Sequence, residues 1–248
     1  MRIAVVGGTG RVGAETVADL EKHGHETVKV SRSTGVDLLT GEGLDAALAG
    51  VDIVIDASNT AAQGEAEIVE FFGTATRNLL AAEERAGVAH HVLLSIVGLD
   101  KGQHVPHYEG KRAQERLVTA GPIQWTIVRA TQFHDFGAMT ATWTLQDGTA
   151  TIAPLLVQPI AIEDVGRVLA EVATGAPRTD RLDAAGPQTQ DLVDMARRTF
   201  AVRGEKVELV PTWRGIFGTD MAGEVLLPGD SAWLGTITFD DWLAAGAE

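Results

Sequence analysis

The chain has 248 residues and a mass of 26.2 kDa, which is enough for one large α/β domain or one domain with a small appended lobe. Apolar residues make up 45% and charged residues 22%, and this globular composition excludes a disordered chain. The formal net charge of −14 argues against nucleic acid or an anionic membrane as the main partner, because their phosphates would be repelled. The absence of Cys rules out disulfides, thiolate metal sites and Cys nucleophiles.

The chain has no targeting or membrane signal that we can identify. No apolar run approaches the length of a membrane span, and the apolar stretch before the first glycines is too short for a signal peptide. We therefore expect a cytoplasmic protein that binds a small-molecule substrate and neither nucleic acid nor membrane. The sequence leaves a homo-oligomeric state open.

The first half of the chain alternates short apolar runs with longer amphipathic segments. A short apolar run is typical of a strand buried on both faces, and a longer segment that stops at glycine is typical of a helix. The predicted elements, in chain order, are the strand Ile3–Val6, the helix Arg11–His23, the strand Thr27–Val30, the helix Leu44–Leu48, the strand Val51–Ile55, the helix Ala66–Ala86, the strand Val92–Ser95, the helix His107–Thr119 and the strand Trp125–Val128. This alternation implies right-handed crossovers and a doubly wound parallel sheet with helices on both faces.

The rhythm changes after about Gln132. The predicted elements here are the helix Phe133–Leu145, the strands Thr149–Ile152 and Leu156–Ile160, the helix Glu163–Ala173 and an edge strand Leu182–Ala184. The remainder mixes helix and loop. We predict one domain over residues 1–248, with a small C-terminal substrate lobe formed mainly by about 133–160 and 186–248 and packed on the carboxyl edge of the sheet.

A glycine-rich loop, Gly7-Gly8-Thr9-Gly10-Arg11-Val12-Gly13, joins the first strand to the first helix. Its GxxGxxG spacing is a variant of the dinucleotide fingerprint, in which glycines allow a tight turn, a close approach to the pyrophosphate and close helix packing. The helix N-terminus adds partial positive charge. The strand and helix supply the required context, so the sequence predicts a Rossmann-type NAD(P)-binding domain. The predicted cofactor contacts in this loop are Gly7, Thr9, Gly10, Arg11, Val12 and Gly13.

The end of the second strand, Val30-Ser31-Arg32-Ser33, indicates which cofactor is bound. A site that prefers NAD usually has an acidic residue here, whereas Arg32 would pair with the 2′-phosphate of NADP. We predict NADP, with NADPH preferred over NADH, and Arg11 as a second positive contact. The other predicted cofactor contacts are Ser31, Asp37 near the adenine, expected after a short strand, and Ala57, Ser58 and Asn59 where the cofactor crosses the sheet.

These motifs and several later ones resemble the atypical short-chain dehydrogenase/reductases, and among them the NmrA-like group of NAD(P)H-binding proteins. The later motifs are Leu94-Ser95-Ile96-Val97-Gly98, Lys111 with Glu115, Thr126 to Phe133, Gln158-Pro159-Ile160, Glu163-Asp164-Val165 and Phe239-Asp240-Asp241-Trp242-Leu243. The resemblance covers nearly the whole chain and implies the superfamily but no substrate. The family includes quinone, carbonyl and isoflavone-type reductases, sugar-nucleotide relatives and redox-sensing regulators without turnover.

Main-line members of this superfamily use a Ser, a Tyr and a Lys, the last two spaced YxxxK on one helical face. In them the Lys bonds the nicotinamide ribose and lowers the Tyr pKa, and the Tyr exchanges a proton with the substrate. Lys111 matches the Lys, and Ser95 stands at the strand end expected for the Ser. His107 occupies the Tyr position, and the chain's single tyrosine, Tyr108, is one residue later.

Three interpretations of this helix stay open: Tyr108 is a displaced proton donor, His107 is the donor because an ordinary His titrates near neutrality, or neither is an essential acid. Lys111 itself is predicted to bind the cofactor. The alternative is an exposed helix lysine paired with Glu115.

Ala130, Thr131, Gln132 and Phe133 follow the strand Trp125–Val128 and are predicted to lie beside the nicotinamide. Phe133 either packs on a planar substrate or anchors the next helix. His104 and His107 have HxxH spacing, but no third ligand is near, and we predict no metal site. No Ser stands in a G-x-S-x-G elbow, which argues against a hydrolase.

The sequence therefore predicts an NADPH-dependent reductase. Hydride would pass to a small carbonyl or quinone bound between Ser95, Tyr108, Phe133 and the lobe. One alternative is an NADP-sensing regulator without turnover, which the missing YxxxK tyrosine supports. Another is a sugar-nucleotide epimerase, which the same tyrosine and the modest chain length weaken.

Overall fold

The computed structural model describes residues 1–102, 105–215 and 217–247. The chain forms two compact units. Unit 1 comprises Met1–Ile96, Pro106–Arg129 and Val165–Leu182, and unit 2 comprises Val97–Val105, Ala130–Asp164 and Asp183–Glu248. Unit 2 contains both ranges that the sequence assigned to the lobe, together with residues 97–105 and a few residues that flank those ranges.

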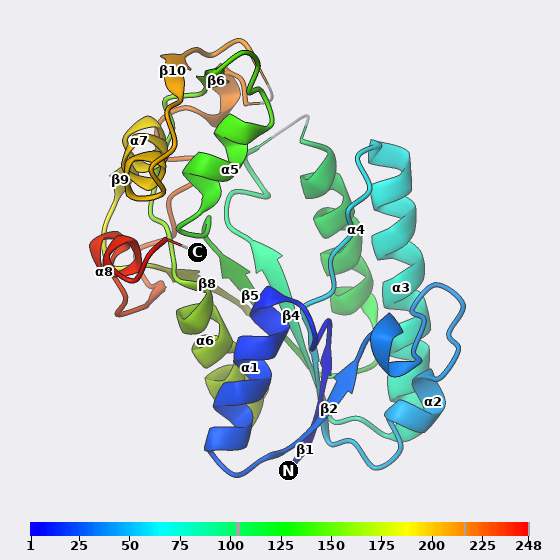
Figure 1. Ribbon diagram of the computed structural model, residues 1–248. Coiled ribbons are helices and arrows are strands. Elements are labelled where there is room, and N and C mark those ends of the chain that lie inside the picture. The colour runs from blue at the N-terminus through cyan, green and yellow to red at the C-terminus, as the bar shows by residue number, and fades with distance from the viewer. Residues whose placement is uncertain (103–104, 216, 248) are drawn as a thin grey trace. The chain divides into compact units, whose positions relative to one another are not determined.

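Among the described residues, seven strands form one sheet in the order β11-β8-β5-β4-β3-β1-β2 (Figure 1). Their bounds are β1 Arg2–Val6, β2 Glu26–Val30, β3 Ile53–Asp56, β4 His90–Ile96, β5 Trp125–Ala130, β8 Arg181–Ala185 and β11 Trp233–Leu234. Parallel register is recorded for β1 with β2 and β3, for β3 with β4, and for β8 with β11. The chain runs from β1 to its neighbour β2 at one edge of the sheet and then continues with β3, β4, β5 and β8 on the other side of β1. The predicted doubly wound parallel sheet is therefore confirmed.

Helices of unit 1 cover both faces of this sheet. Their bounds are α1 Arg11–Lys22, the 3₁₀ turn η1 Arg32–Thr34, α2 Leu44–Ala47, α3 Glu65–Ala86, α4 Pro106–Ala120 and α6 Ile162–Thr174, whose first residues belong to unit 2. Figure 1 shows α1 beside α6, and α3 beside α4. Glycine permits both approaches, since a Cβ on Gly166 would lie 2.9 Å from Glu15 and one on Gly110 would lie 2.5 Å from the Phe72 ring.

The core of unit 1 follows from the apolar runs. Ile3 to Val6 are fully buried, as expected for a strand with helices on both faces. One buried cluster joins β1, β2 and β3 to α2 and α3: Ala4, Val6, Val30, Val36, Leu44, Leu48, Val51, Val54, Leu79, Ala82 and Val88. The long helix α3 ends at Gly87, whose φ of +74° is the left-handed conformation that closes helices.

Unit 2 is built from shorter elements. Their bounds are α5 Phe136–Thr142, β6 Thr149–Ile152, β7 Leu156–Val157, β9 Gln190–Asp191, α7 Leu192–Val202, β10 Glu208–Pro211, η2 Thr219–Met221 and α8 Phe239–Ala244. Strands β6 and β10 pair in parallel, and β7 and β9 pair antiparallel. Helices α5 and α7 touch closely, because a Cβ on Gly137 would lie 2.8 Å from the Ala196 nitrogen.

Several predicted elements need correction. The strand at Leu182–Ala184 is not an edge strand, because β11 pairs with its far side at Ala184 and Ala185. No strand precedes Asp37 after β2; the turn η1 stands there instead. The strand predicted to reach Ile160 stops at Val157, close to Pro159, which has no N–H for a ladder.

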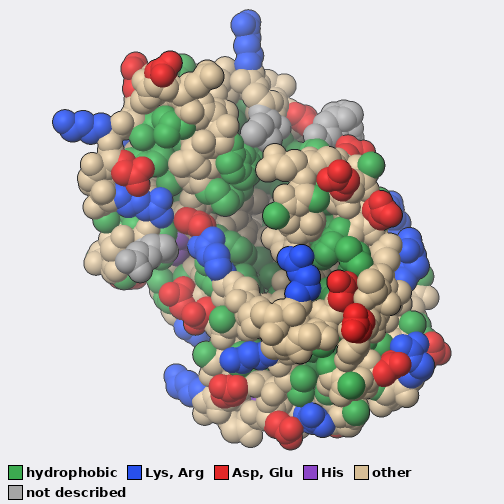
Figure 2. Space-filling view, turned by 45° about the vertical axis from the view of Figure 1, so that its right-hand side comes forward, with side chains coloured by type: hydrophobic (Ala, Val, Ile, Leu, Met, Phe, Trp, Pro, Cys, Tyr) green, Lys and Arg blue, Asp and Glu red, His purple; other side chains and the backbone are tan. Residues whose placement is uncertain are grey.

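The surface of the described residues carries mixed charge. On the face drawn in Figure 2, basic and acidic side chains lie singly or in small groups among neutral ones. No helix in the described ranges is both long and apolar enough to cross a membrane. The same residues contain no group of three or more His, Asp or Glu side chains placed to hold a metal ion.

Candidate functional site

The glycine loop between β1 and α1 leaves no room for side chains at two positions. Gly7 has a φ of +75°, and a Cβ on it would lie 2.7 Å from the Ala57 carbonyl oxygen. A Cβ on Gly13 would lie 2.1 Å from the Gly7 oxygen. The loop therefore packs tightly against α1 and against the segment that follows β3. This is the tight turn and close helix packing that the glycine spacing predicted.

The N-terminus of α1 has the features of an anion cradle. Gly10 is its N-cap in extended conformation and supplies no side-chain hydrogen bond, and the first turn contains no acidic residue. The partial positive charge of this helix end is therefore not offset by a capping carboxylate. Thr9, Gly10 and Arg11 are exposed, whereas Val12 is buried beneath the helix.

The turn after β2 displays Arg32. Ser31 and Thr34 form a reciprocal capping box, and the Thr34 hydroxyl also donates to the Lys29 carbonyl at 3.0 Å. These bonds fix the turn and leave Arg32 exposed at its start. Asp37 has a structural use, because one of its carboxylate oxygens accepts from the Leu39 nitrogen at 2.7 Å and the Thr40 nitrogen at 3.2 Å.

The segment after β3 contains an unsatisfied hydroxyl. Asp56 is buried and accepts from the Ser58 nitrogen at 2.9 Å. The Ser58 side chain is 5% exposed, and its Oγ has no hydrogen-bond partner among the described residues. A buried hydroxyl without a partner costs free energy unless a ligand or water supplies one. Asn59, by contrast, is exposed, and its side chain accepts from the Thr60 nitrogen.

Lys111 is buried beside Ser58. Its Nζ donates to the Leu94 carbonyl at 3.0 Å and to Gln114 Oε1 at 2.9 Å, and lies 3.5 Å from the Ser58 carbonyl. Burial lowers the pKa of Lys111 to about 8, although Asp56 and Glu115 act in the opposite direction. The side chain is 4% exposed and lies over the Phe72 ring, so the alternative of an exposed lysine paired with Glu115 is wrong.

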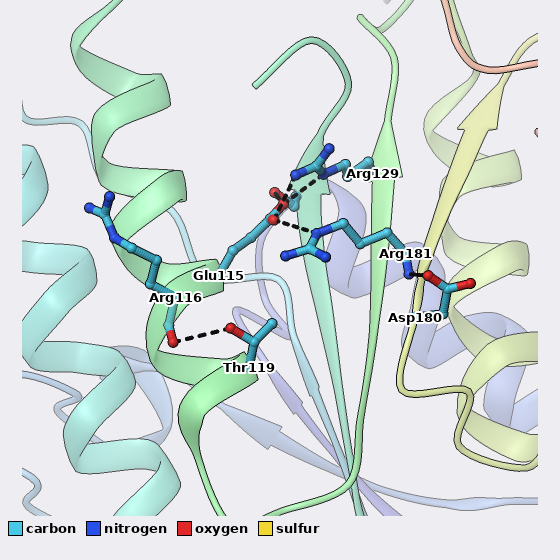
Figure 3. A network of polar contacts seen from close by, with 7 residues as sticks. Glu115, Arg116, Thr119, Arg129, Asp180 and Arg181 are labelled. Carbon is cyan, nitrogen blue, oxygen red and sulfur yellow. Dashed lines mark hydrogen bonds and ion pairs between the residues drawn. The ribbon is translucent and has the colours of Figure 1, made fainter. Parts of the chain in front are cut away.

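Glu115 instead forms the centre of a separate network (Figure 3). Arg129 donates to both of its oxygens at 2.9 and 2.8 Å, and Arg181 donates at 3.0 Å. Burial raises the pKa of Glu115, but hydrogen bonds from Arg129, Ser95 and Arg181 outweigh it and hold that pKa below its usual value. Ser95 lies at the end of β4 as predicted, and its hydroxyl donates to Glu115 at 2.6 Å.

The two candidate acids on α4 differ in their surroundings. Tyr108 is buried, as is Lys111 three residues later, so the helix turns both side chains inward. The His107 ring packs edge-on against Phe72, and burial together with Lys111 lowers the pKa of His107 to about 4. His107 is therefore neutral at pH 7, which argues against it as the acid.

Sequence reasoning missed two further residues of this region. Gln114 connects Lys111 to Asp56, because its Nε2 donates to Asp56 Oδ2 at 2.8 Å. Asp56 stands directly after the apolar run of β3, and Gln114 stands three residues after Lys111. Polar residues at those places, on a strand end and on the helix face of Lys111, are a signal that could have identified them.

The residues predicted to lie beside the nicotinamide, 130–133, belong to unit 2. Thr131 donates to the Gln158 carbonyl at 2.6 Å, and Phe133 forms a bridge with Ile160. Ala130 is buried. The Oε1 of Gln132 is buried without a partner in the described part of the chain. His104 of the HxxH pair lies outside the described residues.

The profile of a family described as NAD(P)H-binding matches residues 7–176, from the glycine loop through the end of α6. The chain belongs to this NAD(P)H-binding family. The match includes the glycine loop, the Arg32 turn and Lys111. The residues of unit 1 therefore stand in a cofactor-binding domain of known kind.

Comparisons with individual proteins extend this result. Photosystem II assembly factor Ycf39 of Synechocystis is 29% identical over 147 residues, which cover 54% of this chain and 45% of that protein. The chain therefore aligns with less than half the length of this relative. The NADPH complex of the Escherichia coli NADPH-dependent quinone oxidoreductase has a TM-score of 0.69, 18% identity and coverage of 85% and 78% of the two chains.

A further solved structure is the Thermotoga maritima UDP-glucose 4-epimerase with UDP-glucose, with a TM-score of 0.77, 13% identity and coverage of 99% and 97%. At these identities the structures demonstrate a shared fold. The Rossmann fold is thereby confirmed, and membership of an NAD(P)H-binding family agrees with the resemblance seen in the sequence.

Proposed function

We propose that the chain is an NADPH-dependent reductase that acts on a small carbonyl or quinone. The observation that carries this proposal is the pair formed by Lys111 and Ser58. Among the described residues, Lys111 is a buried cation without a direct carboxylate partner, and it lies beside the buried Ser58 hydroxyl, which has no hydrogen-bond partner there. Such a pair suits the hydroxyl groups of a bound ribose. The likeness in fold to an NADPH-dependent quinone oxidoreductase supports the reaction class.

The residues present fit a dinucleotide. At Gly7 and Gly13 the protein's own backbone fills the space of a side chain, so the loop packs against α1 and the N-terminus of that helix stays exposed at Thr9 and Gly10, where a pyrophosphate could bind. In the proposal, the α1 N-terminus and Gly10 hold the pyrophosphate, Arg32 holds a 2′-phosphate, and Ser58 and Lys111 hold the nicotinamide ribose. When bound, the nicotinamide supplies hydride.

The chain's own contribution would be to bind, orient and supply a proton. Lys111 is held by Leu94 and Gln114, so its position is fixed before any ligand arrives. We assign the proton donor to Tyr108, because His107 is neutral at pH 7 and Tyr108 is the chain's single phenol. Ser95 remains a predicted catalytic residue whose hydroxyl donates to Glu115 in this conformation.

The cofactor part of the proposal is tested by replacing Gly10 with Asp and, as a matched control, with Asn. Both are good N-cap residues and fit the extended backbone at this position, so both variants should fold. The Asp carboxylate repels the pyrophosphate, whereas the Asn amide is neutral. We expect NADPH affinity to fall at least about tenfold more for Asp than for Asn. Equal NADPH affinities in the two variants would show that the glycine loop is not part of the cofactor site.

The choice between NADPH and NADH depends on Arg32. Replacing Arg32 with Ala should lower NADPH affinity about tenfold or more and leave NADH affinity nearly unchanged, because only NADPH carries the 2′-phosphate. Fluorescence titration with both cofactors measures the ratio. Replacement of Arg197, an exposed arginine of α7, is the control. An unaltered ratio in Arg32→Ala would refute the 2′-phosphate role.

Turnover is tested by NADPH consumption against quinones, aldehydes, ketones and imines. We expect oxidation of NADPH with one of these classes, and a large loss of the rate of carbonyl reduction in Tyr108→Phe. A protein that binds NADPH but consumes none with any class would favour the NADP-sensing regulator. The sensor would then be recognised by different affinities for oxidised and reduced cofactor.

A further inference from the structure

Three aromatic side chains meet on unit 2, three residues or more along the chain from Phe133, the nearest residue assigned to the cofactor. Phe136 begins α5, Trp143 follows its last residue, and Phe217 lies in the segment after β10. Their ring centroids are 5.8 Å apart for Phe136 and Phe217 and 6.4 Å apart for each of the other two pairs. Trp143 is nevertheless 51% exposed. A cluster of rings that leaves an indole half open offers flat apolar surface to a ligand.

The rings border a hollow whose walls come from α5, β6 and the segment after β10. Its lining residues are Thr140, Trp143, Thr144, Thr151, Ile152, Ala153, Thr212, Arg214, Gly215 and Phe217. Hydrogen bonds join the walls: Thr144 donates to the Thr151 carbonyl at 2.7 Å and accepts from its nitrogen at 3.0 Å. The Thr212 nitrogen donates to the Ile152 carbonyl at 2.9 Å. The hollow is therefore formed before a ligand binds, which reduces the entropy cost of binding.

The charge of this hollow's lining favours a negative ligand, because its charged side chain is an arginine. The hydroxyls of Thr140 and Thr144 donate to backbone carbonyls within unit 2, so they do not offer a proton to a ligand. The charged lining residue is Arg214, and no ion pair of its guanidinium is recorded among the described residues. The chain as a whole carries −14, and Arg214 places a positive charge beside these aromatic rings.

From this arrangement we infer that unit 2 has a binding site for a planar aromatic anion, such as an aromatic carboxylate. The rings of Trp143 and Phe217 would contact the flat face of the ligand, and Arg214 would pair with its charged group. The site lies within unit 2 and does not depend on the proposed reductase activity. It would account for the exposure of Trp143, which the packing of unit 2 alone leaves half open.

The experiment is isothermal titration calorimetry of the full-length protein with 2-naphthoate, its neutral analogue 2-naphthamide, and cyclohexanecarboxylate as an anion without an aromatic ring. We expect the order 2-naphthoate, then 2-naphthamide, then cyclohexanecarboxylate, with about tenfold between the first two. Equal affinity for the acid and the amide would overturn the role of Arg214. An absence of naphthoate binding at millimolar concentration would overturn the site.

Variants of the lining residues test whether the ligand binds in this hollow. Arg214→Gln should weaken 2-naphthoate about tenfold and leave 2-naphthamide unchanged, whereas Trp143→Ala should weaken both ligands. Leu234→Ala and Arg197→Gln are matched controls, because both residues are exposed parts of unit 2 outside the hollow. Circular dichroism melting and NADPH affinity should stay at wild-type values in all variants, which verifies the fold. Unchanged naphthoate affinity in Trp143→Ala would place the ligand elsewhere.

Discussion

Lys111 and Glu115 stand one helical turn apart on α4, yet their surroundings are opposite. The Glu115 carboxylate receives hydrogen bonds from two guanidinium groups and a hydroxyl, so its charge is compensated inside unit 1. The Lys111 ammonium has two carbonyl oxygens and an amide oxygen near it and no carboxylate in direct contact. One buried charge is thus compensated by opposite charges, whereas the other is surrounded by neutral oxygen atoms.

The two pKa values express this difference. Hydrogen bonds outweigh burial at Glu115 and hold its pKa low, whereas burial dominates at Lys111 and lowers its pKa to about 8. Perturbed lysines of this kind occur at functional sites, because the charged form is expensive and a ligand can make it favourable. This difference favours a structural role for Glu115 and supports the proposed role of Lys111 in cofactor binding.

The largest expected effect is the loss of stability on replacing Glu115 with Gln. The change leaves the Arg129 guanidinium buried without its counter-charge, so the free energy of unfolding should fall by about 3 kcal/mol or more. Glu109→Gln is the matched control, because Glu109 pairs with Arg112 on a more exposed part of the same helix and should lose less than about 1 kcal/mol. Urea unfolding measures both. Similar losses in the two variants would contradict the structural role of Glu115.

A second prediction concerns pH. The unfolded chain keeps the Lys111 proton up to its ordinary pKa of 10.5, whereas the folded chain releases it near 8. Between these values the unfolded state binds more protons, so the stability of the wild type should rise relative to Lys111→Met, by on the order of 3 kcal/mol in total. Glu115 changes stability in the same direction at lower pH: folding lowers its pKa too, so its stabilising contribution is present above pH 4.5 and is lost on acidification.

Denaturant unfolding of wild type and Lys111→Met at several pH values between 7 and 10.5 measures the lysine effect. Lys22→Met, which removes an exposed lysine of α1, is the control and should run parallel to the wild type. If the difference in free energy of unfolding between the wild type and Lys111→Met stays constant over this pH range, burial does not lower the pKa of Lys111.

The smallest expected effect is on binding. Lys111→Met should lower NADPH affinity about tenfold, the value of one charge-assisted contact, without lowering stability at pH 7. Fluorescence titration of Lys111→Met and of Lys22→Met provides the comparison. If Lys111→Met loses stability and keeps its affinity, Lys111 is structural like Glu115 and the proposed ribose contact is wrong.

The helices and strands predicted from the sequence agree closely with the structure in unit 1 and less closely in unit 2. The first strand, the glycine loop and α1 were predicted from an apolar run, glycine spacing and a helix stop, all of which act locally. The edge strand at Leu182–Ala184 was wrong because β11 comes from a two-residue segment, Trp233–Leu234, that is too short for any periodicity. Short strands depend on their partners and give no signal of their own.

In the candidate site, too, some features could be predicted from the sequence and others could not. The positions of Lys111, Ser95 and Arg32 were predictable, because each stands at a fixed distance from a strand end or a motif. The partners of Lys111 and Glu115 were not predictable. The spacing of four residues suggested that the two charges pair with each other, whereas residues far along the chain, Asp56, Arg129 and Arg181, decide the outcome.

The sequence alone therefore determined the parallel sheet, the glycine loop and the NAD(P)H-binding family, because these rest on local backbone geometry and on periodic burial. The tertiary structure decided which charge on α4 is compensated and which is left without a carboxylate. The physical reason is that burial and hydrogen bonding set the cost of a charge, and both come from residues brought together only when strands distant in the sequence become neighbours in the sheet.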